Sequence, residues 1–247
     1  MLAIIGGSGL YSLGEDFHLG EQCSRQTPYG ETSADVLLGR WQDVDIAFLP
    51  RHGPDHRVPP HAVNYRANLW ALKQAGVSNI IAVNAVGGIS TDMAPAALSI
   101  PQQLIDYSSG REHSFCDGRD GVVLHVDFSQ PYSETLRAAL KQAAAQLDLA
   151  IVDSGTYGCT NGPRFETAAE IERMRRDGCS IVGMTGMPEA GLARELEIEY
   201  ACVALVVNWA AGIAEGAISM EEIMANLEHG IQRLRPLLLS AARLIEA

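Results

Sequence analysis

The chain has 247 residues, of which 47% are hydrophobic and 19% are charged, a composition typical of an ordered globular protein rather than a disordered or collagen-like one. Eighteen Lys and Arg residues against 30 Asp and Glu residues give a formal net charge of −12. This acidity argues against a non-specific grip on nucleic acid and against attraction to an anionic membrane.

Short apolar runs bounded by turn residues alternate with longer amphipathic stretches, which is typical of strands buried in an α/β sheet. The expected strands are Leu2–Ile5, Ala34–Leu38, Ile46–Leu49, Ile80–Val83, Gln103–Asp106, Ile151–Gly158, Ile181–Met184 and Ala201–Val207. The expected helices are His61–Ala75, Tyr132–Leu147, Thr167–Arg176, Pro188–Leu196 and Ser219–Ile245. Residues Ser108–Gln130, rich in Gly, Asp and His, show little periodicity and are expected to form a functional or disordered loop. We therefore predict a single α/β domain over residues 1–247.

No apolar run approaches the roughly 20 residues needed to span a bilayer, and no basic segment of the signal-peptide type precedes Leu2–Ile5. The five cysteines are odd in number, widely spread and without a CxxC pair. Neither a disulfide framework nor a zinc ribbon is indicated, and we expect a cytoplasmic protein.

Small and polar residues follow several expected strands at their carboxyl ends, where open α/β sheets bind ligands. Gly6-Gly7-Ser8-Gly9 fits either a tight turn or a loop that presents backbone N–H groups to an anion. Its spacing does not fit the G-x-G-x-x-G fingerprint of a dinucleotide site. After the strand that ends at Leu49, Arg51 is a candidate bidentate phosphate ligand beside His52, with a solvated basic turn as the alternative.

Three histidines stand close together in this region. His52, His56 and His61 are four and five residues apart, but the intervening prolines prevent one helical face from presenting all three. No carboxylate or cysteine completes a familiar ligand set, so we expect no metal.

Three further motifs follow later strands. Asn84-Ala85-Val86-Gly87-Gly88 suits either backbone contact with a ligand or a tight turn. Phe165 and Glu166 could stack on a flat ring and accept its hydrogen bond, whereas the alternative places Glu166 in the first turn of a helix. Asn208 ends the most apolar strand, and its amide needs both donor and acceptor partners, from a ligand or from a local backbone turn.

In this order and spacing, the motifs resemble the trimeric purine nucleoside phosphorylase and methylthioadenosine phosphorylase family over essentially the whole chain. The most specific segments are Gly6-Gly7-Ser8-Gly9, Arg51-His52-Gly53, residues 63–72 (VNYRANLWAL), Asn84-Ala85-Val86-Gly87-Gly88, residues 162–167 (GPRFET) and residues 184–189 (MTGMPE). The resemblance implies a central twisted mixed β-sheet flanked by helices, of the nucleoside phosphorylase type. It also implies a homotrimer without a metal or organic cofactor, in which inorganic phosphate, as co-substrate, attacks the anomeric carbon of a purine nucleoside. We expect neither a nucleic acid nor a membrane as a partner.

The resemblance also implies roles for individual residues. The expected phosphate ligands are Ser8, Arg51, His52, Asn84, Ala85 and Thr185. Met184 would lie against the ribose, and Phe165, Glu166 and Asn208 would face the base. Among the catalytic residues, Asn208 would stabilise the leaving purine at N7 and O6, Glu166 would hold N1–H, and His52 would help to orient phosphate. His125 would be lent by the neighbouring subunit, and His56 would lie either at the pocket rim or in a solvated loop.

The substrate expectation depends on a few positions. Asn208 and Glu166 stand where adenine-selective relatives carry Asp and Ser, and Ala210 replaces a second Asp, which together favour a 6-oxopurine. Met220 falls where inosine phosphorylases offer a His to the 5′-hydroxyl, and with Ile223 it would form an apolar wall for a methylthio group. The alternative is that both are core residues.

The expected substrate is therefore S-methyl-5′-thioinosine, ahead of inosine or guanosine and then methylthioadenosine. Three other classes stay open: a nucleoside-binding module without chemistry, a nucleoside hydrolase and a dinucleotide-dependent oxidoreductase.

Overall fold

A ten-stranded mixed sheet forms the centre of the protein in the computed structural model, which describes residues 1–118 and 123–246. The strand order is β2-β5-β6-β1-β7-β11-β10-β9, with β12 paired to β7 and β8 paired to β12. The strands are β1 Leu2–Gly6, β2 Phe17–Cys23, β5 Val36–Trp41, β6 Val44–Pro50, β7 Asn79–Gly88, β8 Leu98–Ser99, β9 Gln103–Asp106, β10 Thr156–Cys159, β11 Ile181–Gly183 and β12 Glu199–Trp209. The short strands β3 Gln26–Thr27 and β4 Gly30–Glu31 form a separate pair.

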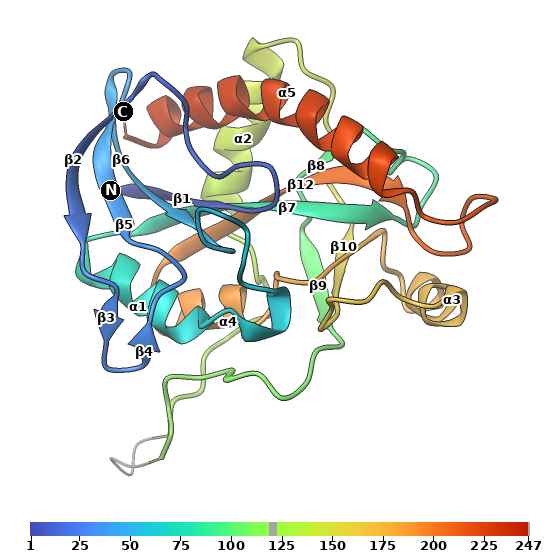
Figure 1. Ribbon diagram of the computed structural model, residues 1–247, viewed down its shortest axis with the longest axis horizontal. Helices are drawn as coiled ribbons and strands as arrows, with labels where there is room; N and C mark the ends of the chain where they lie inside the picture. The colour runs from blue at the N-terminus through green and yellow to red at the C-terminus, as the bar shows by residue number, and fades with distance from the viewer. Residues whose placement is uncertain (119–122, 247) are drawn as a thin grey trace.

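Helices cover both faces of the sheet (Figure 1). They are α1 Tyr65–Gln74, α2 Glu134–Gln146, α3 Ala168–Arg176, α4 Glu189–Glu195 and α5 Met220–Glu246, with a 3₁₀ turn at Pro60–Ala62. Helices α2 and α5 pack on one face, and α1 and α4 on the other. Because side chains alternate along a strand, Leu2 and Ile4 of β1 join the first core, while Ala3 and Ile5 join the second.

The predicted fold class is confirmed, and each predicted helix and strand has a counterpart. The predicted strand Ile151–Gly158 is wrong at its start, because β10 begins at Thr156 and the preceding residues make one isolated bridge, Val152 to Ser99. Strands β2, β3, β4 and β8 were not predicted. In β2 the sequence FHLGEQC is mostly exposed, so it lacks the apolar run that marks a buried strand.

Parallel pairing positions the functional residues. Strands β6, β1, β7 and β12 run parallel in succession, so their carboxyl ends meet at one edge of the sheet. Strand β11 runs antiparallel to the end of β7, so the residues that follow it run back alongside β7 and reach Asn84, which bonds Thr185. Among residues 1–118 and 123–246, no helix combines the length and apolarity needed to cross a bilayer.

Candidate active site

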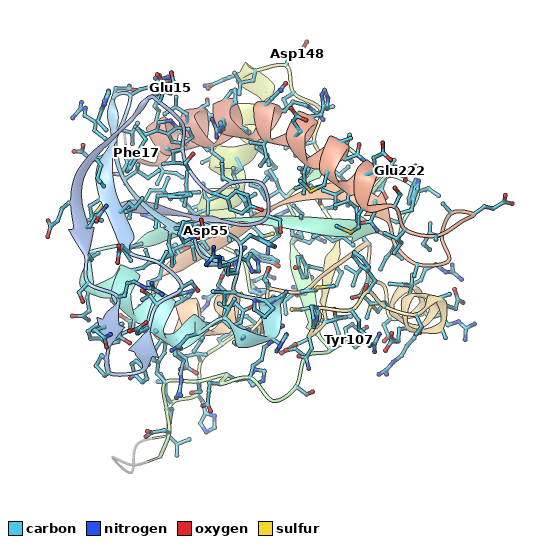
Figure 2. All side chains as sticks on the ribbon, viewed as in Figure 1. Glu15, Phe17, Asp55, Tyr107, Asp148 and Glu222 are labelled. Atoms are coloured by element: carbon cyan, nitrogen blue, oxygen red, sulfur yellow. The ribbon has the colours of Figure 1, made fainter. Side chains whose placement is uncertain are left out.

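A cavity of about 470 Å³ opens where these strands end. Figure 2 labels Asp55, in the turn after β6, and Glu222, in the first turn of α5, two segments that border the cavity. The predicted site residues that line it are Ser8, Arg51, His52, His56, Ala85, Phe165, Glu166, Met184, Thr185, Asn208, Met220 and Ile223. Asn84 and His125 are outside this lining.

Arg51 is fully buried and lines the cavity. Its Nε and Nη2 each donate to a Glu189 carboxylate oxygen at 2.7 Å, and Nη1 donates to the Val83 carbonyl oxygen at 3.0 Å. A guanidinium has five N–H groups, so two remain after these bonds for an anion in the cavity. The solvated-turn alternative for Arg51 is therefore wrong.

Glu189 holds Arg51 in its charged form. Burial acts to lower the pKa of Arg51, but the charge and hydrogen bonds of Glu189 outweigh burial and raise the pKa above its ordinary value. Tyr200 also donates its hydroxyl to Glu189 Oε1 at 2.8 Å. The sequence motif at residues 184–189 includes Glu189 but does not indicate its role, because a Glu in a first helical turn is common without a partner.

The loop after β1 lies against this arginine. A Cβ on Gly7 would lie 2.3 Å from the Val83 carbonyl oxygen and 3.1 Å from Arg51 Nη1, so only glycine allows the close approach. Leu10 N–H donates to the Gly7 carbonyl at 3.1 Å, and Gly9 has a φ of 84°. The segment is thus a tight turn that also presents Gly7 and Ser8 to the cavity.

Thr185 and Asn84 form a buried chain of hydrogen bonds. Asn84 Nδ2 donates to Thr185 Oγ1 at 2.7 Å, and the Cys202 thiol donates to Asn84 Oδ1 at 3.2 Å. Since Thr185 Oγ1 already accepts from Asn84, its own proton is left to donate toward the cavity. Asn84 thus lies behind Thr185 rather than on the cavity wall.

His52 is 5% exposed beside Arg51. Its Nδ1 lies 2.8 Å from the Val58 carbonyl oxygen, which only accepts, so Nδ1 carries the proton and Nε2 of the neutral ring is an acceptor. Burial, followed by the charge of Arg51, lowers the pKa of His52 to about 4. The ring is therefore neutral near pH 7.

His56 and Tyr11 form the rim beside His52. The His56 ring lies 4.8 Å from the His52 ring, and Tyr11 contacts it edge-on at 5.6 Å between centroids. Burial lowers the pKa of His56. Tyr11 also lines the cavity, and sequence reasoning missed it because a single aromatic after a glycine turn carries no motif.

Phe165, Glu166 and Asn208 also line the cavity, and they come from distant parts of the chain. Glu166 Oε1 accepts a hydrogen bond from Thr160 Oγ1 at 2.6 Å. Because Thr167 is the N-cap of α3, Glu166 precedes the helix, and the alternative that places it in the first helical turn is wrong.

Asn208 follows a register shift in β12, between Val206 and Asn208, that re-aims its side chain. Its Nδ2 donates to the Trp209 carbonyl at 2.7 Å, which leaves one N–H and Oδ1 for another partner. The local backbone therefore satisfies only part of this amide.

Met220 and Ile223 begin α5. Ile223 is 6% exposed and belongs to the main core as well as to the cavity wall. Met220 is 58% exposed, so the alternative of a core residue is wrong for Met220.

His125 is exposed and lies outside the cavity of its own chain. It belongs to the long segment between β9 and α2, of which residues 119–122 are outside the described residues. Among the described residues, no three His, Cys, Asp or Glu side chains cluster closely enough to hold a metal ion.

The fold and the cavity define an α/β protein in which a buried arginine with two further N–H groups and the polar side chains of Glu166 and Asn208 line one cavity. The sequence model of the Phosphorylase superfamily matches residues 1–243, and the chain belongs to this family. It is an enzyme of the phosphorylase type, as predicted.

Curated relatives cover nearly the full chain. A probable S-methyl-5′-thioinosine phosphorylase of Pseudomonas syringae pv. tomato is 52% identical over 99% of this chain and 98% of the relative. The 6-oxopurine nucleoside phosphorylase of Pyrococcus furiosus is 44% identical over 99% of this chain and 92% of its own. Among solved structures, methylthioadenosine phosphorylase of Schistosoma mansoni with adenine has a TM-score of 0.93 at 33% identity, covering 99% of this chain and 91% of that one.

Proposed function

We propose that the protein catalyses the phosphorolysis of S-methyl-5′-thioinosine to hypoxanthine and 5-methylthioribose 1-phosphate. The observation that carries the proposal is the joint lining of one cavity by Asn208, Glu166 and Met220. The first two suit a 6-oxopurine, and the third suits a 5′-methylthio group. The name of the 52%-identical relative gives independent support.

The base end favours hypoxanthine over adenine. Glu166 Oε1 is occupied by Thr160, and the other carboxylate oxygen is an acceptor for the N1–H that hypoxanthine carries and adenine lacks. The remaining N–H of Asn208 donates to O6, and Oδ1 accepts from N7–H as the purine leaves. Each mismatch with adenine costs about 1–3 kcal/mol, so two together change selectivity by orders of magnitude.

The 5′ end favours a methylthio group over a hydroxyl. Met220 cannot donate a hydrogen bond, and Ile223 and Leu227 continue an apolar wall from the same helix. A thioether packs well against such a wall. Inosine remains the second candidate, since the 44%-identical relative is named a 6-oxopurine nucleoside phosphorylase.

The anion end positions the attacking phosphate. Two N–H groups of Arg51, the hydroxyls of Ser8 and Thr185 and the backbone at Ala85 supply donors, and neutral His52 supplies an acceptor for a protonated phosphate oxygen. Fixed donors hold the dianion next to the anomeric carbon and stabilise the charge of an oxocarbenium-like transition state. Phosphate is a co-substrate, and no metal or organic cofactor takes part.

Four further expectations, on domain number, oligomeric state, location and partners, belong to the same proposal. One domain over residues 1–247 is supported by the shared sheet. The homotrimer, with His125 lent to the neighbouring subunit, is supported by the family resemblance and by the exposure of His125 outside its own cavity. A cytoplasmic location rests on the cysteine pattern, and the acidic charge supports the absence of nucleic acid or membrane partners.

The test is hypoxanthine release from S-methyl-5′-thioinosine in phosphate buffer and in phosphate-free buffer, with the sugar product identified by mass spectrometry. Phosphorolysis predicts release only with phosphate and a 5-methylthioribose 1-phosphate product. Release without phosphate indicates a hydrolase, and binding without release indicates a nucleoside-binding module.

A further inference from the structure

Arg111 forms hydrogen bonds with four backbone carbonyls in the loops that follow β10 and β11. Its Nη2, which carries two N–H groups, lies 2.8 Å from the Met184 carbonyl oxygen, 3.0 Å from that of Asn161 and 3.2 Å from that of Thr160, so one N–H is shared between two of them. Its Nη1 donates to the Met187 carbonyl. Arg111 itself does not line the cavity.

These carbonyls belong to two loops that follow neighbouring parallel strands. Thr160 and Asn161 follow β10 and lead to Phe165, whereas Met184 and Met187 follow β11. Carbonyl oxygens brought together repel one another and need donors when buried. A planar guanidinium satisfies several at once and fixes the spacing between the two loops.

Each loop places a cavity residue directly beside its bond to Arg111. The Thr160 carbonyl accepts from Arg111, while the Thr160 hydroxyl donates to Glu166 Oε1 at 2.6 Å. Likewise, the Met184 carbonyl accepts from Arg111, while the Met184 side chain lines the cavity. One side chain therefore bonds both Thr160, the residue that holds Glu166, and Met184, whose side chain lines the cavity.

The ring of Tyr65 packs against the guanidinium of Arg111. Its guanidinium carbon lies 5.3 Å from the centre of the Tyr65 ring in α1. The Arg111 backbone belongs to the segment that passes from β9 beneath α1 and α4 (Figure 1).

We propose that Arg111 is a positioning residue that holds the base-binding and ribose-binding loops at the spacing the nucleoside requires. This inference rests on the proposed function for the identity of the bound nucleoside. Of the anion contacts, Arg51, Ser8 and His52 lie on the turns after β6 and β1, and their hydrogen bonds among the described residues do not involve Arg111. Thr185 lies on the loop after β11, but its hydroxyl is held by Asn84 of β7.

Loss of Arg111 should affect the KM for the nucleoside more than the KM for phosphate. Substitution Arg111→Ala should raise the nucleoside KM by about tenfold or more, because four carbonyls lose a charged donor. The phosphate KM should change by less than about threefold, since the donors at Arg51 stay in place. Added guanidinium, at concentrations that leave the fold intact, should restore part of the nucleoside affinity.

Arg66 provides a matched control. Its guanidinium also lies 5.3 Å from a tyrosine ring, that of Tyr29, and pairs with Glu112 of the same segment at 3.1 Å. No hydrogen bond of Arg66 to the loops after β10 or β11 is found among the described residues. Arg66→Ala should therefore keep the wild-type nucleoside KM and show no guanidinium effect.

Arg111→Lys is a second, more conservative variant that keeps the test informative if Arg111→Ala does not fold. Lysine keeps the charge but offers one nitrogen in place of a planar fork, so a folded Arg111→Lys variant should also show the raised nucleoside KM. In Arg111→Ala, equal changes in both KM values or a wild-type nucleoside KM would overturn the proposal. A raised nucleoside KM in Arg66→Ala, or failure of both Arg111 variants to fold, would also overturn it. If the wild-type enzyme acts on another nucleoside instead, the proposed function fails, and the Arg111 comparison is made with that nucleoside.

Discussion

Arg51 and Glu189 form a bidentate ion pair with both N–O distances at 2.7 Å, although 138 residues separate them along the chain. Both side chains are 0% exposed. The pair ties the turn after β6 to the first turn of α4 and aims the remaining N–H groups of Arg51 at the cavity. A buried pair of this kind is costly to break from one side, because the remaining charge has no water to solvate it.

We expect Glu189→Gln to lower the free energy of unfolding by about 3 kcal/mol or more, since it leaves Arg51 buried and uncompensated. Phosphate should stabilise this variant against urea, because an anion in the cavity supplies the missing countercharge. The control is Glu170→Gln, whose partner Arg164 is exposed and whose loss should cost under about 1 kcal/mol. Equal urea midpoints for the two variants would contradict the structural role of Glu189.

The pH dependence of the free energy of unfolding should reflect the protonation of His52. Its pKa is about 4 in the folded protein against an ordinary 6.5, so the unfolded chain binds the extra proton between these values. The free energy of unfolding should therefore be highest above pH 6.5 and fall by about 3 kcal/mol as the pH decreases to 4.

Urea titrations between pH 4 and 6.5 measure how steeply the free energy of unfolding depends on pH. His52→Gln should make this dependence weaker, whereas His229→Gln, on the exposed surface of α5, should leave it as in the wild type. An unchanged slope in His52→Gln would show that other groups carry the pH dependence.

Asn208→Asp should reverse base selectivity. A carboxyl group loses the N–H donated to O6 and gains an acceptor for the amino group of adenine, so hypoxanthine release should fall about 10- to 100-fold. Activity on methylthioadenosine should rise. Intact 6-oxopurine turnover with no gain on adenine nucleosides would contradict the role given to Asn208.

Met220→His should shift the preference at the 5′ end. An imidazole can donate to a 5′-hydroxyl, so kcat/KM for inosine relative to S-methyl-5′-thioinosine should increase about tenfold. Met220→Leu keeps the wall apolar and should leave that ratio near the wild-type value. A ratio that is the same in both variants would place Met220 outside the 5′ contact.

Sequence reasoning located most of the cavity because the informative residues stand at strand ends. Turn residues such as Gly7 and Ser8 interrupt apolar runs, and parallel strands bring those interruptions to one edge. Periodicity did not identify β2, whose side chains are mostly exposed, because an edge strand need not be apolar.

The contacts that orient the site residues could not be predicted from the sequence. The partnership of Glu189 with Arg51 depends on packing between segments 138 residues apart. Asn84 falls within a segment that suits ligand contact, yet its amide donates to Thr185. Arg111 lies in an aperiodic segment, where nothing in the local pattern signals four carbonyl partners.

We propose that one cavity combines a 6-oxopurine end with a methylthio end. The most direct test is kcat/KM in phosphate buffer for S-methyl-5′-thioinosine, inosine, guanosine, methylthioadenosine and adenosine, measured side by side with the released base identified by chromatography. We predict that S-methyl-5′-thioinosine has the highest value and that both adenine nucleosides have the lowest. A higher value for inosine would contradict the role of Met220, and a higher value for methylthioadenosine would contradict those of Asn208 and Glu166.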